Sequence, residues 1–340
     1  MNTLVLGILL IFISGFFQGT YGLGMKKYQP LSWEAFWILF SILSMFVIPA
    51  IWISLTVPDS LAALCVASEK DIWAAICMGA LWGIGALLWG FGIVQIGMSL
   101  TYGIGMSMTA ISGSLGMLIQ MEGVTQMPFF PYLILGTFLM IMGILVITYA
   151  AILREQFRNN HSPVVRKQKL LFVLALIGVF FSGLFSGLLN IGFNRVYSVA
   201  EAAVSQGASP ANASLVQWIY VFIGGFIVQI IYAVVLLIKN KSYKTYFVSG
   251  SGKAYFTIFL TALFWFAALG LYGQGATIMG RFGSVFGWTM FISISLIVSN
   301  VWAVLTSEWK NSGKAFKMLL IGNLLLLISA VVLGVSNSLQ

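Results

Sequence analysis

Residues 14–27 read SGFFQGTYGLGMKK, and residues 182–195 read SGLFSGLLNIGFNR. The two stretches share Ser, Gly, Phe, Gly, Gly and a final basic residue in the same order, and position 182 matches position 14. A second set repeats with position 265 standing for position 82: Trp82, Trp89, Gly90, Gly92 and Gly97 correspond to Trp265, Tyr272, Gly273, Gly275 and Gly280. Two ordered sets of matches indicate that the chain contains two copies of one unit.

The composition places both copies in a membrane. Of the 340 residues, 60% are hydrophobic and only 7% are charged, and the mean hydropathy is +1.01. A soluble domain carries about 25% charged residues to cover its surface. The outer surface of this chain must therefore face lipid, and nucleic-acid binding is a poor explanation of the net charge of +9. A backbone in hydrocarbon must satisfy its own hydrogen bonds, which predicts an all-α polytopic membrane protein.

Ten segments are apolar over the ~20 residues that a membrane-spanning helix needs. The N-terminal run lacks a basic leader and a small-residue cleavage site, so we interpret it as a retained helix rather than a signal peptide. The predicted spans are 3–24, 33–57, 72–95, 98–120, 131–152, 170–193, 212–238, 255–277, 283–306 and 315–336.

The loop charges predict the orientation of these spans. With the N-terminus outside, 14 of the 17 Lys and Arg residues fall in cytoplasmic loops, and only Lys70, Arg195 and Arg281 lie outside. Cytoplasmic loops carry an excess of Lys and Arg, so this strong bias predicts that both termini lie outside, in the periplasm of a bacterial cell.

Each half then holds five helices. We expect an N-terminal repeat over residues 1–152, a basic cytoplasmic linker over 153–169 and a C-terminal repeat over 170–340. Because five is odd, the second copy enters the membrane upside down. Inverted repeats are typical of alternating-access transporters, whose site lies between the two halves. The repeated Gly-x-x-x-Gly spacing also has a simpler interpretation, close packing of neighbouring helices.

Several motifs resemble the L-rhamnose–proton symporter family. They span nearly the whole chain in order: Lys26-Lys27 followed by Ser32-Trp33-Glu34 and Trp37, Leu81-Trp82-Gly83-Ile84-Gly85, Ile96-Gly97-Met98-Ser99, Gly103-Ile104-Gly105, Glu201-Ala202-Ala203, and Glu308-Trp309-Lys310-Asn311. The resemblance implies the drug/metabolite transporter fold, with ten helices in two inverted halves. It also implies import of L-rhamnose, or a related 6-deoxyhexose, with a proton across a bacterial inner membrane. The alternative is import or export of another small solute by the same fold.

A sugar site needs hydrogen-bonding side chains and an aromatic surface for the apolar face of the ring. Intramembrane polar groups are costly when unpaired, so the few present are worth considering. The candidates for substrate binding are Gln18, Asn190, Gln217, Gln274 and Asn300 among polar residues, and Trp82, Trp89, Trp218, Trp265, Tyr272 and Trp288 among aromatic ones. Hydrogen bonding between helices is the alternative role for each polar residue, and packing is the alternative for each aromatic ring.

Proton coupling needs a group that changes its protonation as access switches, and a carboxyl group in a low-dielectric cavity can do so. No Asp or Glu falls at the middle of a predicted helix. The nearest candidates are Glu34, Glu201 and Glu308, all near helix ends. The alternative role for each is a terminal charge stabilised by the helix dipole or by a nearby Lys.

Other classes of function find little support. Two cysteines, Cys65 and Cys77, and the single histidine, His161, make neither a disulfide framework nor a metal site. No phosphate-binding loop is present, which argues against ATP-driven transport by this chain. A membrane enzyme would need clustered His, Cys or carboxylates. We therefore expect no enzyme activity and no cofactor, with the proton as coupling ion and a sugar and the lipid bilayer as partners.

Overall fold

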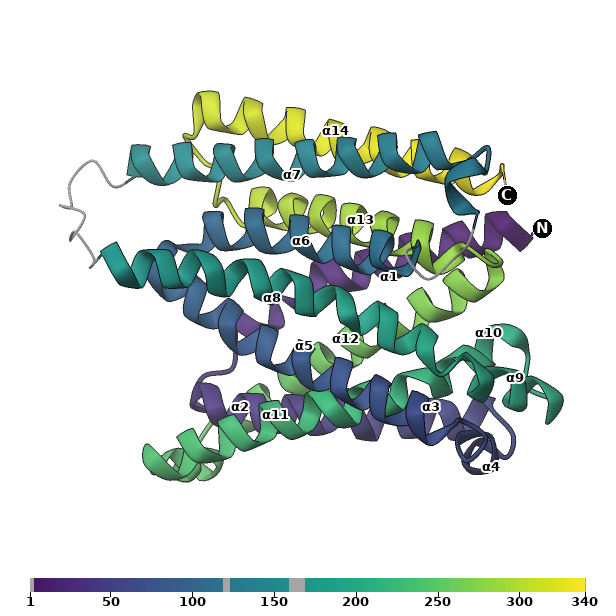
Figure 1. Ribbon diagram of the computed structural model, residues 1–340. Helices are drawn as coiled ribbons and strands as arrows, with labels where there is room; N and C mark the ends of the chain where they lie inside the picture. Colours follow the sequence, from purple (N-terminus) through teal and green to yellow (C-terminus); the bar gives the residue numbers. More distant parts are fainter. Residues whose placement is uncertain (1–2, 119–122, 159–168, 340) are drawn as a thin grey trace.

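The computed structural model describes residues 3–118, 123–158 and 169–339 (Figure 1). Throughout these residues the regular structure is helical. The first half holds α1 (Thr3–Tyr21), η1 (Gly24–Lys26), α2 (Trp33–Ile42), η2 (Leu43–Val47), α3 (Ile48–Thr56), α4 (Ser60–Leu64), α5 (Glu69–Ile96), α6 (Met98–Leu118), η3 (Val124–Gln126) and α7 (Phe130–Arg158).

The second half begins with α8 and adds short helices before its second long one. Its elements are α8 (Lys169–Arg195), α9 (Tyr197–Ser205), α10 (Pro210–Ala213), η4 (Ser214–Gln217), α11 (Trp218–Lys239), η5 (Ser242–Phe247), α12 (Ser251–Ile278), α13 (Gly283–Leu305) and α14 (Gly313–Asn337). The predicted basic linker, 153–169, is the end of α7, the first residue of α8 and a segment, 159–168, that lies outside the described residues together with His161.

Within the described residues, nine helical stretches are long and apolar enough to cross a membrane. Each coincides with a predicted span. The remaining predicted span, 98–120, corresponds to α6, whose Gly, Ser and Thr residues make it less apolar than the other nine. Its last two predicted residues lie outside the described part of the chain.

Two helix starts show why the chain folds as it does locally. Ser32 precedes α2, and its hydroxyl accepts a hydrogen bond from the Ala35 amide at 3.2 Å. Ser68 precedes α5 and accepts from the Asp71 amide at 3.1 Å in the same way. Each serine satisfies a backbone donor that the first turn of a helix would otherwise leave unpaired.

A glycine with a positive φ lies in the turn between each of two pairs of long helices. Gly97 lies between α5 and α6 with φ of 86°, and Gly280 lies between α12 and α13 with φ of 91°. Residues with a side chain rarely adopt this left-handed conformation, so glycine is required at both turns. The two residues correspond in the second set of sequence matches, although the first connection is Gly97 alone and the second is residues 279–282.

Helix pairing follows a reciprocal pattern. α1 packs against α12 and α13, and α8 packs against α5 and α6. Likewise α11 packs against α5, and α2 packs against α12. When α1 is exchanged with α8, α2 with α11, α5 with α12 and α6 with α13, each of these pairings becomes another one that the structure contains. The core therefore lies where the halves interlock, rather than inside each half.

The repeated glycines lie at these contacts. A Cβ atom at Gly19 of α1 would lie 2.6 Å from the Ser295 carbonyl oxygen of α13. A Cβ atom at Gly187 of α8 would lie 1.9 Å from Ser112 Oγ of α6. Gly19 and Gly187 correspond in the first set of matches, and Ser112 and Ser295 have the spacing of the second set. Glycine is needed at both positions because the helices approach too closely for a side chain.

The two ends of the helix bundle differ in what they carry (Figure 1). The chain termini lie together at one end, on the right in the view. The C-terminal part of α7 and the segments after α1, α11 and α13 lie at the opposite end, and we call them the basic loops. They hold most of the Lys and Arg residues that the structure describes, so the basic charge of this part of the chain is concentrated at the end opposite to the termini.

Candidate functional site

A cavity of about 750 Å³ lies between the two halves, bounded by side chains of α1, α2, α5, α6, α8, α11, α12 and α13. Trp82 of α5 and Trp265 of α12 form part of its wall, and their rings stack with centroids 5.9 Å apart and planes 21° apart. These two residues correspond in the sequence repeat. The stack therefore joins α5 and α12 at positions that match in the sequence.

Further rings continue the wall from this stack toward one end of the cavity. Phe40 contacts Trp265 edge-on, with centroids 6.0 Å apart. Trp37 lies 5.4 Å from Phe40 and stacks on Trp33 at 5.2 Å. Trp33 is 36% exposed, so this row of rings leads from the surface to the tryptophan pair.

The cavity opens at the end of the bundle that carries the basic loops. Its exposed lining residues include Val94, Tyr232, Tyr102, Phe91 and Trp33. They lie at the C-terminal parts of α5 and α11 and the N-terminal parts of α6 and α2. Those helix ends all face the basic loops.

Four residues form a hydrogen-bonded group beyond the opposite end of the cavity, and we call them the polar seal: Asn190, Tyr272, Ser284 and Gly113. The Asn190 Nδ2 group donates to the Gly113 carbonyl at 2.7 Å and to the Ser284 carbonyl at 3.1 Å. The Tyr272 hydroxyl donates to Asn190 Oδ1 at 2.6 Å. Between the polar seal and the cavity, Trp288 Nε1 donates to the Thr109 carbonyl at 3.1 Å. The polar seal joins helices of both halves.

Five of the predicted substrate-binding residues line the cavity. The half-buried Gln18 contributes from α1, and the remaining four are tryptophans: Trp82, Trp89, Trp265 and Trp288. Trp89 packs edge-on against Tyr102 at 5.0 Å. The cavity thus offers large aromatic surfaces and few polar atoms, which suits a small ligand with a partly apolar face.

The structure does not bring the other predicted residues into this cavity. Asn190 and Tyr272 belong to the polar seal, and Trp218 is fully buried between Phe193 and Phe222. The remaining three amides bond within the protein. Gln217 Nε2 donates to the Phe193 carbonyl at 2.9 Å, Gln274 Nε2 to Asn212 Oδ1 at 2.9 Å, and Asn300 Nδ2 to Asn323 Oδ1 at 2.8 Å.

Glu34 is the buried carboxylate of the three proton-coupling candidates, with 7% of its surface exposed. Its Oε1 accepts hydrogen bonds from Asn240 Nδ2 at 3.0 Å and from Ser242 Oγ. In the described residues no Lys or Arg forms an ion pair with it. Glu34 is thus a buried acid held by two neutral donors, beside cavity-lining Trp33 and Trp37 on the same helix.

The loop segment η5 covers the start of α2 next to Glu34. The Tyr246 hydroxyl donates to the Ala35 carbonyl at 3.1 Å. Burial, with smaller contributions from Tyr255 and Glu34, raises the pKa of Tyr246 to about 12. Its hydroxyl therefore remains protonated at neutral pH and keeps this hydrogen bond.

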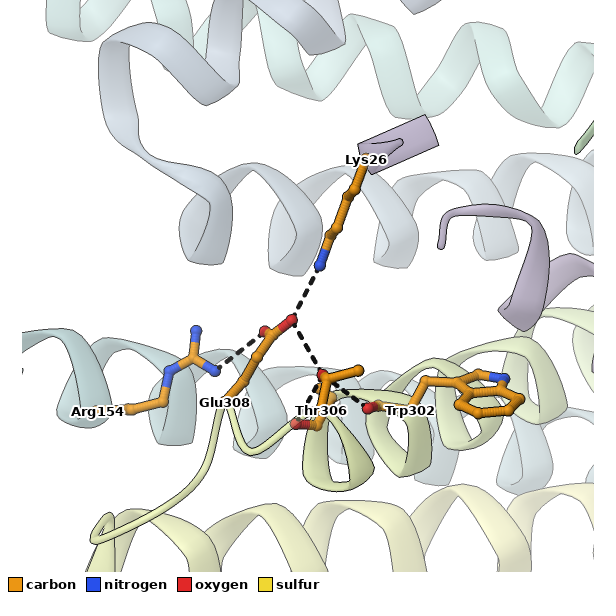
Figure 2. Close-up of polar contacts among 6 residues, drawn as sticks. Lys26, Arg154, Trp302, Thr306 and Glu308 are labelled. Carbon is orange, nitrogen blue, oxygen red and sulfur yellow. Dashed lines mark hydrogen bonds and ion pairs between the residues drawn. The ribbon is translucent and has the colours of Figure 1, made fainter. Parts of the chain in front are cut away.

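Glu308 lies in an exposed ion-pair cluster at the basic end. Figure 2 shows Lys26 and Arg154 approaching its carboxylate from two different elements, with Nζ–Oε1 and Nη1–Oε2 distances of 2.9 and 3.7 Å. Glu201 is exposed on α9. Arg195, which the sequence places on the outer side, pairs with Asp71 at 2.7 Å rather than with Glu201. Solvent-exposed pairs of this kind are weak, and they are poorly suited to carry a proton across a membrane.

Sequence reasoning missed several cavity residues, among them Gln229, Trp37, Tyr102 and Ser186. Gln229 is an amide inside a predicted span, so the rule that selected Gln217 would also have selected it. Ser186 matches Gln18 in the first set of sequence matches, and this match could have identified Ser186 as a candidate once Gln18 was selected. The positions of Trp37 and Tyr102 depend on how α2 and α6 are rotated, which the sequence does not show.

Comparison with known proteins gives a consistent result over the whole chain. The family described as "L-rhamnose-proton symport protein (RhaT)" matches residues 1–338. A protein of Cronobacter sakazakii named L-rhamnose-proton symporter is 24% identical over 349 residues, with 98% of each chain covered. Proteins of the same name from Citrobacter koseri and Yersinia pestis are 24% and 23% identical, again with 98% of each chain covered.

Proposed function

The chain belongs to the L-rhamnose-proton symport protein family, and from this premise we propose that it imports L-rhamnose with a proton across the bacterial inner membrane. The observation that carries the proposal is the cavity between the halves, with its stacked Trp82–Trp265 pair. An aromatic wall suits the C–H face of a 6-deoxyhexose, whose methyl group makes it more apolar than glucose. Proteins of this family are transporters rather than enzymes.

We propose that ten helices span the membrane, with α6 as the tenth, in two inverted halves of five. Three observations support this arrangement: the reciprocal helix pairing, the matched turn glycines Gly97 and Gly280, and the matched contacts of Gly19 and Gly187. α6 packs against α8 and α13 and lines the cavity through Tyr102. Its lower hydropathy is consistent with a helix that faces a substrate path rather than lipid.

The open and closed ends of the cavity support alternating access. The basic loops are assigned to the cytoplasm by the excess of Lys and Arg, which places both termini in the periplasm. The cavity then opens inward, and the polar seal separates it from the periplasm. In the sequence repeat, Asn190 corresponds to Gly22 and Tyr272 to Trp89. The inner end of the cavity thus lacks an amide equivalent to Asn190. Rocking of the two halves would open the polar seal and would close the inner end around Trp89.

We propose that Glu34 carries the coupled proton. It is buried, it lacks an ion-pair partner in the described residues, and Trp33 and Trp37 place it beside the cavity wall. Protonation would remove an acceptor lone pair from the Glu34 carboxylate, which accepts the hydrogen bonds of Asn240 and Ser242. That change would loosen the contact between α2 and the loop after α11, and in this way proton binding would bias the inner opening.

Uptake into proteoliposomes tests the function. With an acidic exterior, labelled L-rhamnose is expected to accumulate above its external concentration, because the proton gradient drives symport. An uncoupler is expected to reduce uptake to equilibration. Uptake that is indifferent to the imposed pH gradient would contradict symport, and a preference for another sugar in the same assay would correct the substrate.

A further inference from the structure

An amide outside the predicted site borders the cavity without a hydrogen-bond partner. Gln229 of α11 is 1% exposed, and neither its Oε1 nor its Nε2 has a partner among the described residues. It lines the cavity between the halves. Buried polar groups in native proteins are nearly always hydrogen-bonded, so an amide with both ends unsatisfied needs an explanation.

The position of Gln229 relates it to the tryptophan pair. A Cβ atom at Gly225 would lie 2.5 Å from the Trp82 ring, so this face of α11 packs directly on Trp82. Gln229 is four residues further along α11, which places it one turn away on the same face. It therefore adjoins the aromatic wall on the side toward Tyr232 and the cavity mouth.

Two further polar atoms of the cavity wall are also buried without a hydrogen-bond partner. Gln18 Oε1 of α1 and Trp37 Nε1 of α2 also have no partner among the described residues. Both residues line the same cavity. Three helices thus carry buried, unsatisfied donors or acceptors in a wall that is otherwise made mainly of aromatic and aliphatic side chains. The α2 side of this space includes Met45, within the π-helical turn η2 (Leu43–Val47), a type of irregularity that is frequent at functional sites.

We infer that Gln229 is a specificity-determining residue that binds two adjacent hydroxyl groups of the transported sugar, with Gln18 and Trp37 binding others. A side-chain amide offers a donor and an acceptor side by side, which matches a vicinal diol. The tryptophan pair would contact the apolar face of the sugar ring, and the Gln229 amide would recognise the arrangement of the sugar hydroxyl groups. This inference rests on the proposed function and names the residues that select the substrate.

The isosteric variant Gln229→Met tests this role, with sugar affinity and thermal stability measured on the purified full chain. Without sugar, we expect the melting temperature of the variant to equal or exceed that of the wild type, because an unsatisfied buried amide is removed. We expect L-rhamnose affinity to fall about tenfold, the effect of losing hydrogen bonds to a bound ligand. If the amide instead has a structural role, the melting temperature of Gln229→Met will be lower than that of the wild type.

Analogues of L-rhamnose that each lack one hydroxyl identify the contact. The wild type is expected to lose about tenfold in affinity for the analogues that lack a hydroxyl bound by Gln229, and Gln229→Met is expected not to discriminate against them. Equal losses for every analogue in both proteins, or wild-type affinity in Gln229→Met, would overturn the inference.

A parallel panel of other sugars keeps the two proposals separate. A wild type that ignores L-rhamnose but binds another sugar would contradict the proposed substrate, and the effect of Gln229→Met on that sugar would still decide the role of the amide. A wild type that binds no sugar would overturn both. Asn300→Leu serves as the matched control, since its amide bonds to Asn323 outside the cavity.

Discussion

Replacement of Glu34 by Gln is expected to abolish accumulation of L-rhamnose against its gradient while leaving exchange of internal for external sugar intact. Gln resembles a permanently protonated Glu in shape and can keep a hydrogen bond to Asn240 or Ser242. The cavity should still alternate between the two faces, but without releasing a proton. Uptake by Glu34→Gln should therefore lose its dependence on external pH and stop at equal concentrations. Counterflow and gradient-driven uptake in the same proteoliposomes measure the two activities.

Two other carboxylates provide controls for this result. Glu201 is exposed on α9, and Glu308 forms exposed ion pairs with Lys26 and Arg154. Glu201→Gln and Glu308→Gln are expected to keep gradient-driven accumulation. If Glu308→Gln loses accumulation and Glu34→Gln retains it, the proton-carrying group has been assigned to the wrong residue.

Removal of either ring of the tryptophan pair is expected to weaken sugar binding roughly 30-fold. This factor corresponds to about 2 kcal/mol, a typical loss for a buried aromatic residue at the centre of a binding site. Trp82→Ala and Trp265→Ala should give similar losses, because the two rings occupy equivalent places in the two halves. Titration with L-rhamnose in detergent, monitored by tryptophan fluorescence or calorimetry, measures the affinity.

The Phe variants and a second tryptophan on the same helix separate binding from folding. Trp82→Phe keeps an aromatic surface and is expected to recover much of the lost affinity. Trp73 of α5 is 64% exposed and lies outside the cavity, so Trp73→Ala should bind as the wild type does. Unchanged affinity in both Trp82→Ala and Trp265→Ala would exclude the stack from the sugar site.

The long helices could be predicted from sequence because they depend on a strong, local signal. Hydrophobic length alone predicts a membrane helix. Matched glycines indicate a repeat because close helix contacts and left-handed turns exclude other residues, as Gly19 and Gly97 illustrate. The predicted span 98–120 is less apolar than the other nine because α6 faces other helices and the cavity.

The site was predicted less completely, because a polar residue in a span has two possible roles that composition does not separate. Asn190 and Gln229 are both buried amides. Asn190 bonds to two carbonyl groups of neighbouring helices, whereas Gln229 borders the cavity unpaired. Which role applies depends on the rotation of each helix about its axis, and only the three-dimensional packing fixes that rotation.

Accessibility of a single cysteine from each face of the membrane tests the central claim, that one cavity opens alternately to the two sides. Ala86 is half-buried in the cavity wall, so Ala86→Cys can be placed in a chain in which Cys65 and Cys77 are replaced by Ser. Leu324→Cys on α14, where Leu324 is 57% exposed on an apolar helix surface, serves as the lipid-facing control.

The measurement is the reaction of this cysteine with a membrane-impermeant maleimide in right-side-out and inverted vesicles. Without sugar, we predict that Ala86→Cys reacts chiefly from the cytoplasmic face, to which we propose that the cavity opens. L-Rhamnose at low external pH is predicted to add reaction from the periplasmic face, and Asn190→Ala is predicted to increase it by weakening the polar seal. Reaction from one and the same face under every condition would contradict alternating access.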